Sequence, residues 1–507
     1  MFGVIIHVVF ILVVLFLTVL YFYLRRIYGY WKDRGIPYEK PSLFFGNLGH
    51  LMRTSSWDFM YNLKTKHKTD YVGIFLGWKP TLVIHSREMA KNILVKDFDS
   101  FQNRYSFPGG QDDPLGALNL FTVRNPTWGK MRHELAPMFT SFRLKGITEL
   151  MNVNSAELVR RIQKDHIDNN KPVDMKELFL MYTSDTIAYT VFGIRLSVLK
   201  DLASPLWHIT GHMVRRTFWR SLEFILIFFI PAVAGLLRLK FFSAPATSYV
   251  KQLFWDVVED REKTKKTNDK DLVHLLLKLK EKLNLPAEAD TSKWSQNTMA
   301  DDLMLAQVAV FIIGAVETSS TTLSFLLHEL AYHPEKQEKL YKEISEALEE
   351  NGKDVLEFND LIELNYLTAC IKETLRKYPA LAFLDRVCNK TYKLDNKVTI
   401  EKGTPVYINL HCIHYNEEYF PEPHEWQPER FGVTNDNNNH DFTFLAFGEG
   451  PRFCIGKRYG FMQIRTAVAH MMMKYRFEPG EPYIVEKDPY SVILGPKSGG
   501  KVKFVSR

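Results

Sequence analysis

Apolar residues recur along this chain with two different periods, and the helical period covers most of its length. Helical spacing runs through residues 150–195, 245–285, 299–332 and 334–351. Such spacing is typical of helices that bury one face or most of their surface. Residues 71–86 alternate instead and predict a β-hairpin with turns at Gly77 and at Lys79-Pro80, and residues 397–414 return to strand-like alternation. The pattern predicts a mainly α chain with a minor β part.

Residues 1–24 are apolar and contain no Asp, Glu, Lys or Arg. About 20 such residues suffice to cross a bilayer, and Arg25 and Arg26 follow at once, which places the rest of the chain in the cytosol. A cleaved signal peptide is the competing interpretation, but the apolar core is too long, no basic segment precedes it and no A-x-A site ends it. We therefore expect a transmembrane anchor at 1–24, a basic, proline-containing connector at 25–50 and a catalytic domain at 51–507.

A second apolar run covers residues 224–242. It is interrupted by Pro231 and Gly235 and is too short to span a membrane. It could be a core helix. Its aromatic residues, flanked by Arg238 and Lys240, favour a segment that lies in the membrane interface.

Composition and charge narrow the class of protein. Of 507 residues, 46% are hydrophobic, and 65 basic residues are scattered among 58 acidic ones, so nucleic-acid binding is not indicated. The 4 cysteines form no CxxC pair, which leaves a zinc site without support. So few cysteines in a long chain are typical of a cytosol-facing protein. Cys370, Cys388 and Cys412 are expected to be small buried side chains.

The fourth cysteine, Cys454, lies in the segment FGEGPRFCIG, residues 447–456, directly before a helix-like run. A turn of this kind can aim a sulfur at a flat metal cofactor, with Gly450 and Gly456 letting the backbone pass close. The start of the following helix favours thiolate over thiol, and a thiolate is a strong axial ligand for haem iron. The alternative is a buried cysteine in a Gly-Pro turn.

Residues 309–327 form an apolar helical pattern that is interrupted by Gly314, Glu317, Thr318 and a Ser/Thr cluster. Ser and Thr side chains bond back to the carbonyl four residues earlier and can distort a helix. A distorted helix over a cofactor would leave room for dioxygen and water. We expect Thr318 to donate a hydrogen bond to dioxygen and Glu317 to pass protons inwards. The alternative is a surface Glu-Thr pair on a long helix.

With these two segments in this order, the chain resembles the cytochromes P-450 over nearly its whole length, and most closely the microsomal xenobiotic-metabolising family 6 of insects. The resemblance implies a triangular prism of helices with small sheets, haem b ligated by the Cys454 thiolate, and dioxygen as co-substrate. It also implies insertion of one oxygen atom into lipophilic substrates such as plant toxins and insecticides. Ala315 stands where the family usually has a second glycine, and its methyl adds bulk beside the expected oxygen groove.

The resemblance also assigns roles to residues outside these two segments. Contacts with haem, including its two propionates, are expected from Phe447, Arg452, Trp128, Arg132, Arg386 and Arg104. A buried charge network that braces the haem side is expected from Glu373, Arg376 and Arg430, with Trp426 where the family usually has Phe. The substrate pocket is expected to be lined by Phe107, Phe121, Phe311, Gly314, Ala315, Leu381, Phe383, Ile493 and Leu494.

The chain is expected to receive its electrons from a partner protein. No GxGxxG loop follows a predicted strand, so the chain is not expected to bind NADPH itself. An NADPH-cytochrome reductase is the expected donor, with cytochrome b5 as a second candidate, and Lys457 and Arg458 beside the cysteine loop could dock an acidic surface. The expected location is the endoplasmic reticulum membrane, with the catalytic domain facing the cytosol.

Three other functions stay open: a haem-thiolate isomerase or dehydratase, a hydroxylase of endogenous hormones or fatty acids, and a haem carrier or sensor. The Glu317-Thr318 pair argues against the isomerase and the carrier, because neither needs a proton relay. The choice between xenobiotic and endogenous substrates is not decided by any residue pattern.

Overall fold

The computed structural model describes residues 2–51, 53–109, 112–169, 173–195, 197–202, 204–214, 217–264, 271–282, 296–432, 442–489 and 491–507. The helices of this part of the chain are α1 (Phe2–Tyr28), α2 (Tyr30–Asp33), α3 (Leu48–Leu51), α4 (Ser56–Lys66), α5 (Arg87–Lys91), α6 (Pro114–Leu118), α7 (Thr127–Leu135), α8 (Ser141–Ile162), α9 (Met175–Phe192), α10 (Pro205–Val214), α11 (Phe218–Phe229), α12 (Pro231–Leu236), α13 (Ala244–Thr264), α14 (Leu272–Lys282), α15 (Gln296–Tyr332), α16 (Pro334–Asn351), α17 (Phe358–Glu363), α18 (Asn365–Lys377), α19 (Leu410–His414) and α20 (Lys457–Met472). The strands are β1 (Tyr71–Leu76), β2 (Lys79–Ile84), β3 (Val173–Asp174), β4 (Phe383–Val387), β5 (Tyr392–Lys393), β6 (Thr399–Ile400), β7 (Pro405–Asn409), β8 (Tyr475–Pro479) and β9 (Lys501–Ser506).

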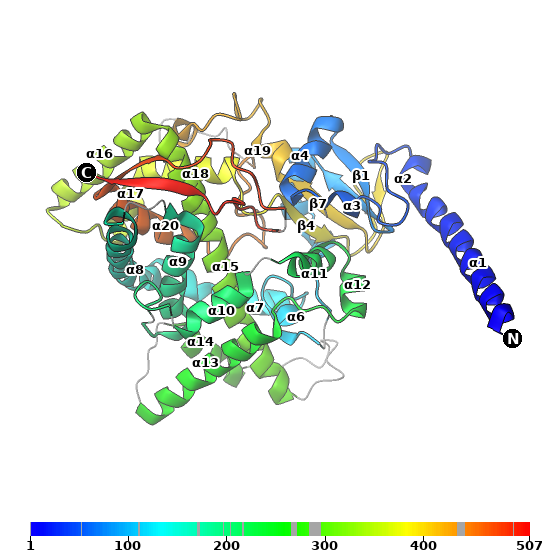
Figure 1. The fold of residues 1–507 in the computed structure, drawn as a ribbon, viewed down its shortest axis with the longest axis horizontal. Coiled ribbons are helices and arrows are strands. Elements are labelled where there is room, and N and C mark those ends of the chain that lie inside the picture. The colour runs from blue at the N-terminus through cyan, green and yellow to red at the C-terminus, as the bar shows by residue number, and fades with distance from the viewer. Residues whose placement is uncertain are drawn as a thin grey trace.

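Helices dominate, as the apolar pattern predicted, and α15 runs through the middle of the helical body (Figure 1). It packs against α6, α9, α18 and α20. Its segment Met299–Tyr332 is long and apolar enough to cross a membrane, but 67% of its most apolar window, whose mean hydropathy is 1.8, is buried inside the protein. A helix that is apolar on all sides and covered by other helices is a core helix.

The sheet beside this helical body has the strand order β1-β2-β7-β4. β1 and β2 form the predicted hairpin, in which Tyr71 pairs with Ile84 and Leu76 with Lys79. The predicted turn at Lys79-Pro80 is wrong, because these residues begin β2. Proline is tolerated there since β2 pairs with β7 only from Leu82 onwards, so the missing N–H of Pro80 interrupts no bond on that side.

Two other predicted elements differ from the structure at their ends. The alternating segment 397–414 holds β6 and β7, but its last residues, Leu410–His414, form α19. The Asn409 side chain accepts a hydrogen bond from the His411 N–H and so caps this helix, which a pattern of alternation does not reveal. The helical segment 150–195 is divided into α8 and α9, and Asp174 caps the second helix.

α1 projects from the side of the molecule that holds this sheet (Figure 1). In the segment Ile5–Asp33 the most apolar window has mean hydropathy 2.9 and none of it is buried, so the segment is a candidate membrane span. Arg25 and Arg26 lie in the last turn of α1. The connector that follows is attached to the sheet, because Trp31 is buried and its Nε1–H donates to the Ile74 carbonyl at 3.0 Å.

The apolar run at 224–242 falls on α11, α12 and the residues that follow, and it divides between core and surface. Phe228 and Phe229 are buried, whereas Leu236 is 80% exposed and Trp219, in the first turn of α11, is 73% exposed. The segment therefore contributes to the core on one side and presents large apolar side chains to solvent on the other.

Candidate functional site

The cysteine loop, residues 447–456, precedes α20 and depends on one glycine above all. The Cys454 N–H donates to the Phe447 carbonyl at 2.8 Å and closes the turn. Gly450 has φ +72°, and a Cβ there would lie 2.0 Å from the Leu94 carbonyl oxygen. Only glycine combines this conformation with this close approach. Gly456 is not required for packing within the protein, because a Cβ there would meet its nearest neighbour at 3.8 Å.

The Cys454 side chain is accessible, yet it lies inside the protein mass. Burial is the largest influence on this thiol and raises its pKa, while the Gly456 N–H and the charges of Arg132, Arg104 and Lys457 act in the opposite direction. In the protein alone, burial therefore raises the pKa of Cys454 more than the start of α20 lowers it. A coordinated metal ion deprotonates a thiol outright.

One face of α15 keeps accessible surface in the middle of the helix. Phe311, Gly314, Ala315 and Thr318 are the residues of this face, whereas residues 319–327 beyond them are buried. Their spacing of three, four and seven positions places them in one row along the helix. We call this row the α15 stripe. The α15 stripe contains both Thr318, which is predicted to take part in catalysis, and Ala315, which stands where the family usually has glycine.

The hydroxyl groups of α15 do not distort it. Thr318 donates to the Gly314 carbonyl at 2.6 Å and Thr322 to the Thr318 carbonyl at 2.9 Å, while the helix continues unbroken from Gln296 to Tyr332. Each carbonyl oxygen has two lone pairs and can accept both the backbone hydrogen bond of the helix and the hydroxyl hydrogen bond. The predicted local distortion is therefore wrong, and Ala315 supports the regular helix because alanine exceeds glycine in helix propensity by about 1 kcal/mol.

Glu317 is buried and lies beside the α15 stripe rather than on it. Its Oε1 is 3.1 Å from Nζ of Lys176, which extends from the first turn of α9. The same ammonium group donates to the Glu317 carbonyl at 3.2 Å, to Ser320 Oγ at 3.0 Å and to Thr321 Oγ1. The carboxylate that the sequence singled out for proton transfer is thus held in an ion pair against α9.

Three arginines gather around one carboxylate near the cysteine loop. Arg104 Nη1 donates to Asp385 at 2.9 Å, and Arg386 follows Asp385 in β4. Burial, together with the charge of Arg104, lowers the pKa of Arg386 to about 9 and that of Arg452 to about 8. Within the described chain, Arg386 Nε and Arg452 Nη1 are buried without a hydrogen-bond partner. Three guanidinium groups against one carboxylate leave two positive charges in excess.

The helix α7 brings its two predicted residues to the same place. Trp128 is buried, and the guanidinium of Arg452 lies 4.3 Å from the centroid of its ring. Arg132, one turn later, lies 4.5 Å from the ring of Phe453, the residue before Cys454. α7 therefore packs its aromatic and cationic side chains against the cysteine loop.

These residues fit haem b. Cys454 supplies an accessible sulfur, and the two excess positive charges with their unpartnered N–H groups match the two propionates of haem. Among the described residues no three His, Cys, Asp or Glu side chains could together hold a metal ion. A haem needs only one such side chain, since the porphyrin supplies four nitrogen ligands.

The predicted charge network is a buried cluster at the C-terminal end of α18. Arg376 donates to both carboxylate oxygens of Glu373, through Nε at 2.7 Å and Nη2 at 2.8 Å, and both side chains are fully buried. Arg430 Nε lies 3.4 Å from Glu373 Oε1. Trp426 is fully buried and donates Nε1–H to Thr374 Oγ1 at 3.1 Å, so tryptophan fits this position without an unpaired N–H.

The residues expected to line the substrate pocket differ in exposure. Phe383 and Leu494 are buried, and Phe383 packs against Phe229 and Tyr407 with ring centroids 5.3 and 5.0 Å apart. The remaining members keep accessible surface: Phe107, Phe121, Phe311, Gly314, Ala315, Leu381 and Ile493. Phe121 stacks under the guanidinium of Arg104 at 4.1 Å, which connects this set with the arginine cluster.

Two residues of the site were missed from the sequence. Asp385 precedes Arg386 directly and accepts hydrogen bonds from the backbone N–H groups of Tyr105 and Ser106 at 2.8 and 3.0 Å. Its position beside a predicted haem-binding arginine was an available signal. Lys176 offered no such signal, because it lies on another helix, 141 residues from Glu317 in the sequence.

Comparison with known proteins agrees with this site. A sequence profile of the family described as Cytochrome P450 matches residues 36–504. Cytochrome P450 6k1 of Blattella germanica is 33% identical over 500 residues, which cover 96% of this chain and 94% of that protein. Probable cytochrome P450 6g2 of Drosophila melanogaster is 32% identical over 514 aligned residues, covering 98% of each chain. Similarity of this extent shows that the chain belongs to the cytochrome P450 family of haem monooxygenases and is similar to its insect family 6 members.

Proposed function

We propose that this chain is a microsomal monooxygenase that oxidises lipophilic compounds, chiefly xenobiotics, with electrons from an NADPH-cytochrome reductase. The overall reaction is RH + O2 + NADPH + H⁺ → ROH + H2O + NADP⁺. The observation that carries the proposal is the α15 stripe, which presents one hydroxyl, that of Thr318, among apolar neighbours on a helix whose other residues from 302 to 331 are buried apart from Val310 and Ile313. Such a surface suits an apolar substrate next to a single proton-handling group.

Haem iron with a thiolate ligand supplies the activation of dioxygen when the cofactor is bound. The chain's own residues then bind, orient and move protons. Arg386 and Arg452 hold the anionic edge of the cofactor with N–H groups that have no partner in the described protein. The Thr318 hydroxyl proton is directed to the Gly314 carbonyl at 2.6 Å, so its oxygen is available as an acceptor on the stripe. Glu317 is the adjacent acidic side chain, and it can pass on towards Thr318 a proton that it first takes up from water.

Several exposed apolar side chains support a membrane-facing side. Residues 44–45 and 236–237 carry exposed Phe and Leu side chains. Residues close to them in the chain come together at Gly77: the Tyr28 hydroxyl at the end of α1 donates to the Gly77 carbonyl at 3.3 Å, Gly46 lies against that carbonyl, and a Cβ on Gly77 would lie 3.0 Å from the Ile230 side chain. The end of α1, this loop and α12 therefore share one side of the molecule. Contact of that side with the endoplasmic reticulum membrane explains its composition.

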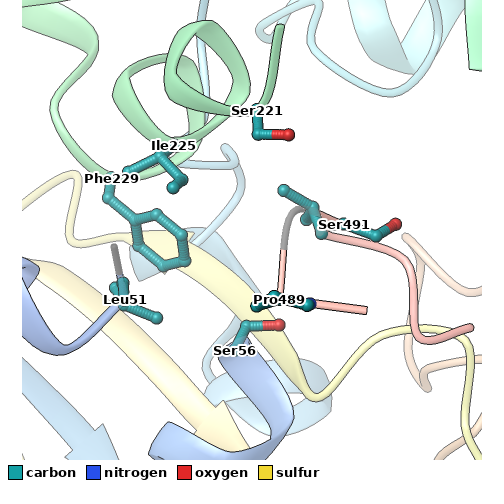
Figure 2. Close-up of a pocket in the computed structure, with 8 residues that line it drawn as sticks. Leu51, Ser56, Ser221, Ile225, Phe229, Pro489 and Ser491 are labelled. Atoms are coloured by element: carbon teal, nitrogen blue, oxygen red, sulfur yellow. The ribbon is translucent and has the colours of Figure 1, made fainter. Parts of the chain in front are cut away.

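A small hollow beneath α11 has room for about one water molecule. It is lined by Leu51, Ser56, Ser221, Ile225, Phe229, Pro489, Ser491 and Val492. Figure 2 shows Ile225 and Phe229 of α11 pointing across it towards Leu51 and Pro489. A space of this size holds no substrate, so the proposal rests on the α15 stripe and not on this hollow.

The charge of the surface beside the cysteine loop indicates where an electron-donating partner would dock. Lys457 and Arg458 are exposed at the start of α20, directly after the cysteine loop. A reductase with an acidic surface would bring its electrons to the cysteine side of the site, and cytochrome b5 is a second acidic candidate. Replacement of both residues by alanine is expected to slow reduction of the haem and to weaken its dependence on ionic strength.

Reconstitution in lipid vesicles with the reductase tests the proposal. The panel of compounds includes plant toxins, insecticides, steroid hormones and fatty acids, and product formation is measured against NADPH oxidation. We expect Cys454→Ala to lose the carbon monoxide difference spectrum of thiolate-ligated haem and all turnover. We expect Thr318→Ala to keep that spectrum and to divert electrons to peroxide. Turnover of the hormones or fatty acids alone would contradict the xenobiotic assignment, and product formation without reductase would contradict the electron route.

A further inference from the structure

We propose that His414 is a positioning residue for the cysteine loop: its ring holds the backbone at Leu445, and this bond fixes the place of the Cys454 sulfur, the proposed ligand of the haem iron. His414 ends α19 and stands 40 residues before Cys454 in the sequence, so no local pattern connects the two. The inference rests on the proposed haem ligation by Cys454, and its test keeps the two questions separate.

Both nitrogens of the His414 ring are hydrogen-bonded to backbone groups. The Leu445 N–H donates to Nε2 at 2.9 Å, and Nδ1 lies 3.0 Å from the Arg376 carbonyl oxygen. A backbone N–H can only donate and a carbonyl oxygen can only accept, so Nδ1 carries the hydrogen and Nε2 is the acceptor. Burial, together with the charge of Arg376, lowers the pKa of this ring to about 3, so Nε2 keeps its lone pair at neutral pH.

The surroundings of His414 hold its ring in this orientation. The side chain is fully buried, and its ring is stacked on that of Phe444, with centroids 6.0 Å apart and an angle of 10° between the ring planes. The His414 carbonyl also accepts a hydrogen bond from Arg376 Nη1 at 2.8 Å, so the two residues are joined by a reciprocal pair of bonds. Arg376 is in turn bound to Glu373. One imidazole therefore connects the buried charge cluster of α18 with the segment that leads into the cysteine loop.

Leu445 is the residue through which this connection reaches the loop. Its carbonyl accepts the Gly448 N–H at 2.8 Å, and the turn so formed leads to Phe447, whose carbonyl accepts the Cys454 N–H at 2.8 Å. These bonds join residues three and seven positions apart, whereas the bond from Leu445 to His414 spans 31 positions. The local bonds give the loop its shape, and the long-range bond fixes that shape relative to α18 and α19.

Loss of the acceptor is expected to loosen the turn because Leu445 is fully buried. A buried N–H without a partner is costly, so the turn has to shift until the N–H meets water or another oxygen. The Cys454 sulfur belongs to the same short segment and moves with it. The helices around α15 keep their own packing, so the thiolate ligand is lost under milder conditions than the helices are.

Two substitutions separate the shape of the ring from its acceptor. His414→Phe keeps a flat ring against Phe444 and removes the acceptor, whereas His414→Gln gives up the ring and places an amide oxygen near the position of Nε2. The matched control is His411→Phe. His411 is also buried on α19, and its ring is stacked on that of Tyr415 with centroids 4.1 Å apart, but the Leu445 N–H donates to His414 instead.

Hydrogen exchange of the full-length, haem-loaded protein in lipid vesicles measures the Leu445 amide directly. We expect this amide to exchange about tenfold faster in His414→Phe than in wild type, because its acceptor is gone. In His414→Gln and in His411→Phe we expect the wild-type rate. A wild-type rate in His414→Phe would overturn the proposal, and so would equally fast exchange in His414→Gln, because the acceptor would then not be what holds the turn.

Urea titration followed both by circular dichroism and by the carbon monoxide difference spectrum tests the link to the sulfur. The readout is the gap between the two midpoints, since one cooperative transition makes different probes coincide. We expect the thiolate spectrum of His414→Phe to be lost at a lower urea concentration than its helical signal, and the gap to return to the wild-type value in His414→Gln. A gap in His414→Phe no wider than in His411→Phe would mean that His414 only stabilises the fold, which would overturn the proposal.

His414→Asn replaces His414→Phe if the latter does not accumulate as folded protein. Its shorter amide reaches the Arg376 carbonyl but not Leu445, so the same fast exchange is expected, and slow exchange would overturn the proposal. Failure of haem ligation by Cys454 would show itself separately, as absence of the thiolate spectrum from wild type, because the exchange of the Leu445 amide is measured without regard to the iron ligand.

Discussion

The buried pair of Glu373 and Arg376 allows a quantitative prediction. In Glu373→Gln the shape of the side chain is kept and one negative charge is removed. Arg376 then loses a bidentate partner with bonds of 2.7 and 2.8 Å, and Arg430 loses a carboxylate oxygen at 3.4 Å. The side chains of Arg376 and Arg430 are 0% and 9% exposed, so water cannot replace the lost partner.

Breaking one partner of a buried pair costs about 3–5 kcal/mol, because the other charge stays buried without compensation. The whole stability of a native domain is about 5–15 kcal/mol. Glu373→Gln is therefore expected to remove a large share of the free energy of unfolding. The amide still offers one acceptor to Arg376, which places the expected loss near the lower end of the range.

Urea denaturation of the haem-loaded protein measures this loss, followed in parallel by circular dichroism and by the carbon monoxide difference spectrum. The control is Glu346→Gln on α16. Glu346 forms a surface pair with Lys342 at 3.6 Å and is 56% exposed, so the expected loss is below about 0.5 kcal/mol. If Glu373→Gln shifts the midpoint no further than Glu346→Gln does, the buried cluster does not stabilise the fold and the reasoning is refuted.

Four further predictions test separate parts of the structure. Gly450→Ala is expected to prevent formation of the cysteine loop, because its Cβ would meet the Leu94 carbonyl at 2.0 Å, and a normal carbon monoxide spectrum would contradict this. Arg452→Met is expected to speed haem transfer to apomyoglobin by about tenfold or more, since a charge-assisted bond of about 1.5–3 kcal/mol is lost. Burial lowers the pKa of His414 to about 3, so the unfolded chain binds more protons and the folded protein loses stability as pH falls from about 6.5 towards 3; in His414→Phe the denaturation midpoint should depend less steeply on pH over this window. Trp219→Phe should reduce the fraction of tryptophan fluorescence that brominated lipids quench, and an unchanged fraction would remove Trp219 from the membrane contact.

Sequence patterns predicted correctly those helices and strands whose physical cause lies within one short segment of the chain. The apolar composition of α1 predicted a candidate span, and the helical spacing of residues 299–332 predicted α15, because a helix buries residues at a repeat that the sequence displays. The hairpin β1–β2 followed from alternation and a turn at Gly77. The prediction was wrong for Lys79-Pro80, because whether proline can continue a strand depends on a neighbouring strand that lies more than 300 residues later in the chain.

In the functional site, too, features within one short segment were predictable, whereas contacts between distant segments were not. Cys454 and Thr318 were proposed as site residues from short segments whose residue types indicate a particular chemistry, and the family resemblance added the arginines. The two positive charges in excess around Asp385 could not be counted from the sequence, because Arg104, Arg386 and Arg452 come from three distant segments. Whether the hydroxyls of α15 distort it was also beyond local reasoning, since it depends on how carbonyl lone pairs are shared in the folded helix.

The sequence by itself determined the class of fold, the cysteine proposed to bind the haem iron, the polar pair on the core helix and the apolar N-terminal segment. Each of these follows from residues that are close together in the chain. Only the tertiary structure decided that Glu317 is paired with Lys176 and that Nε of Arg386 and Nη1 of Arg452 are buried without a hydrogen-bond partner among the described residues. Pairing and desolvation are properties of distant segments in contact, and their strength depends on the water that folding removes, which no linear pattern records.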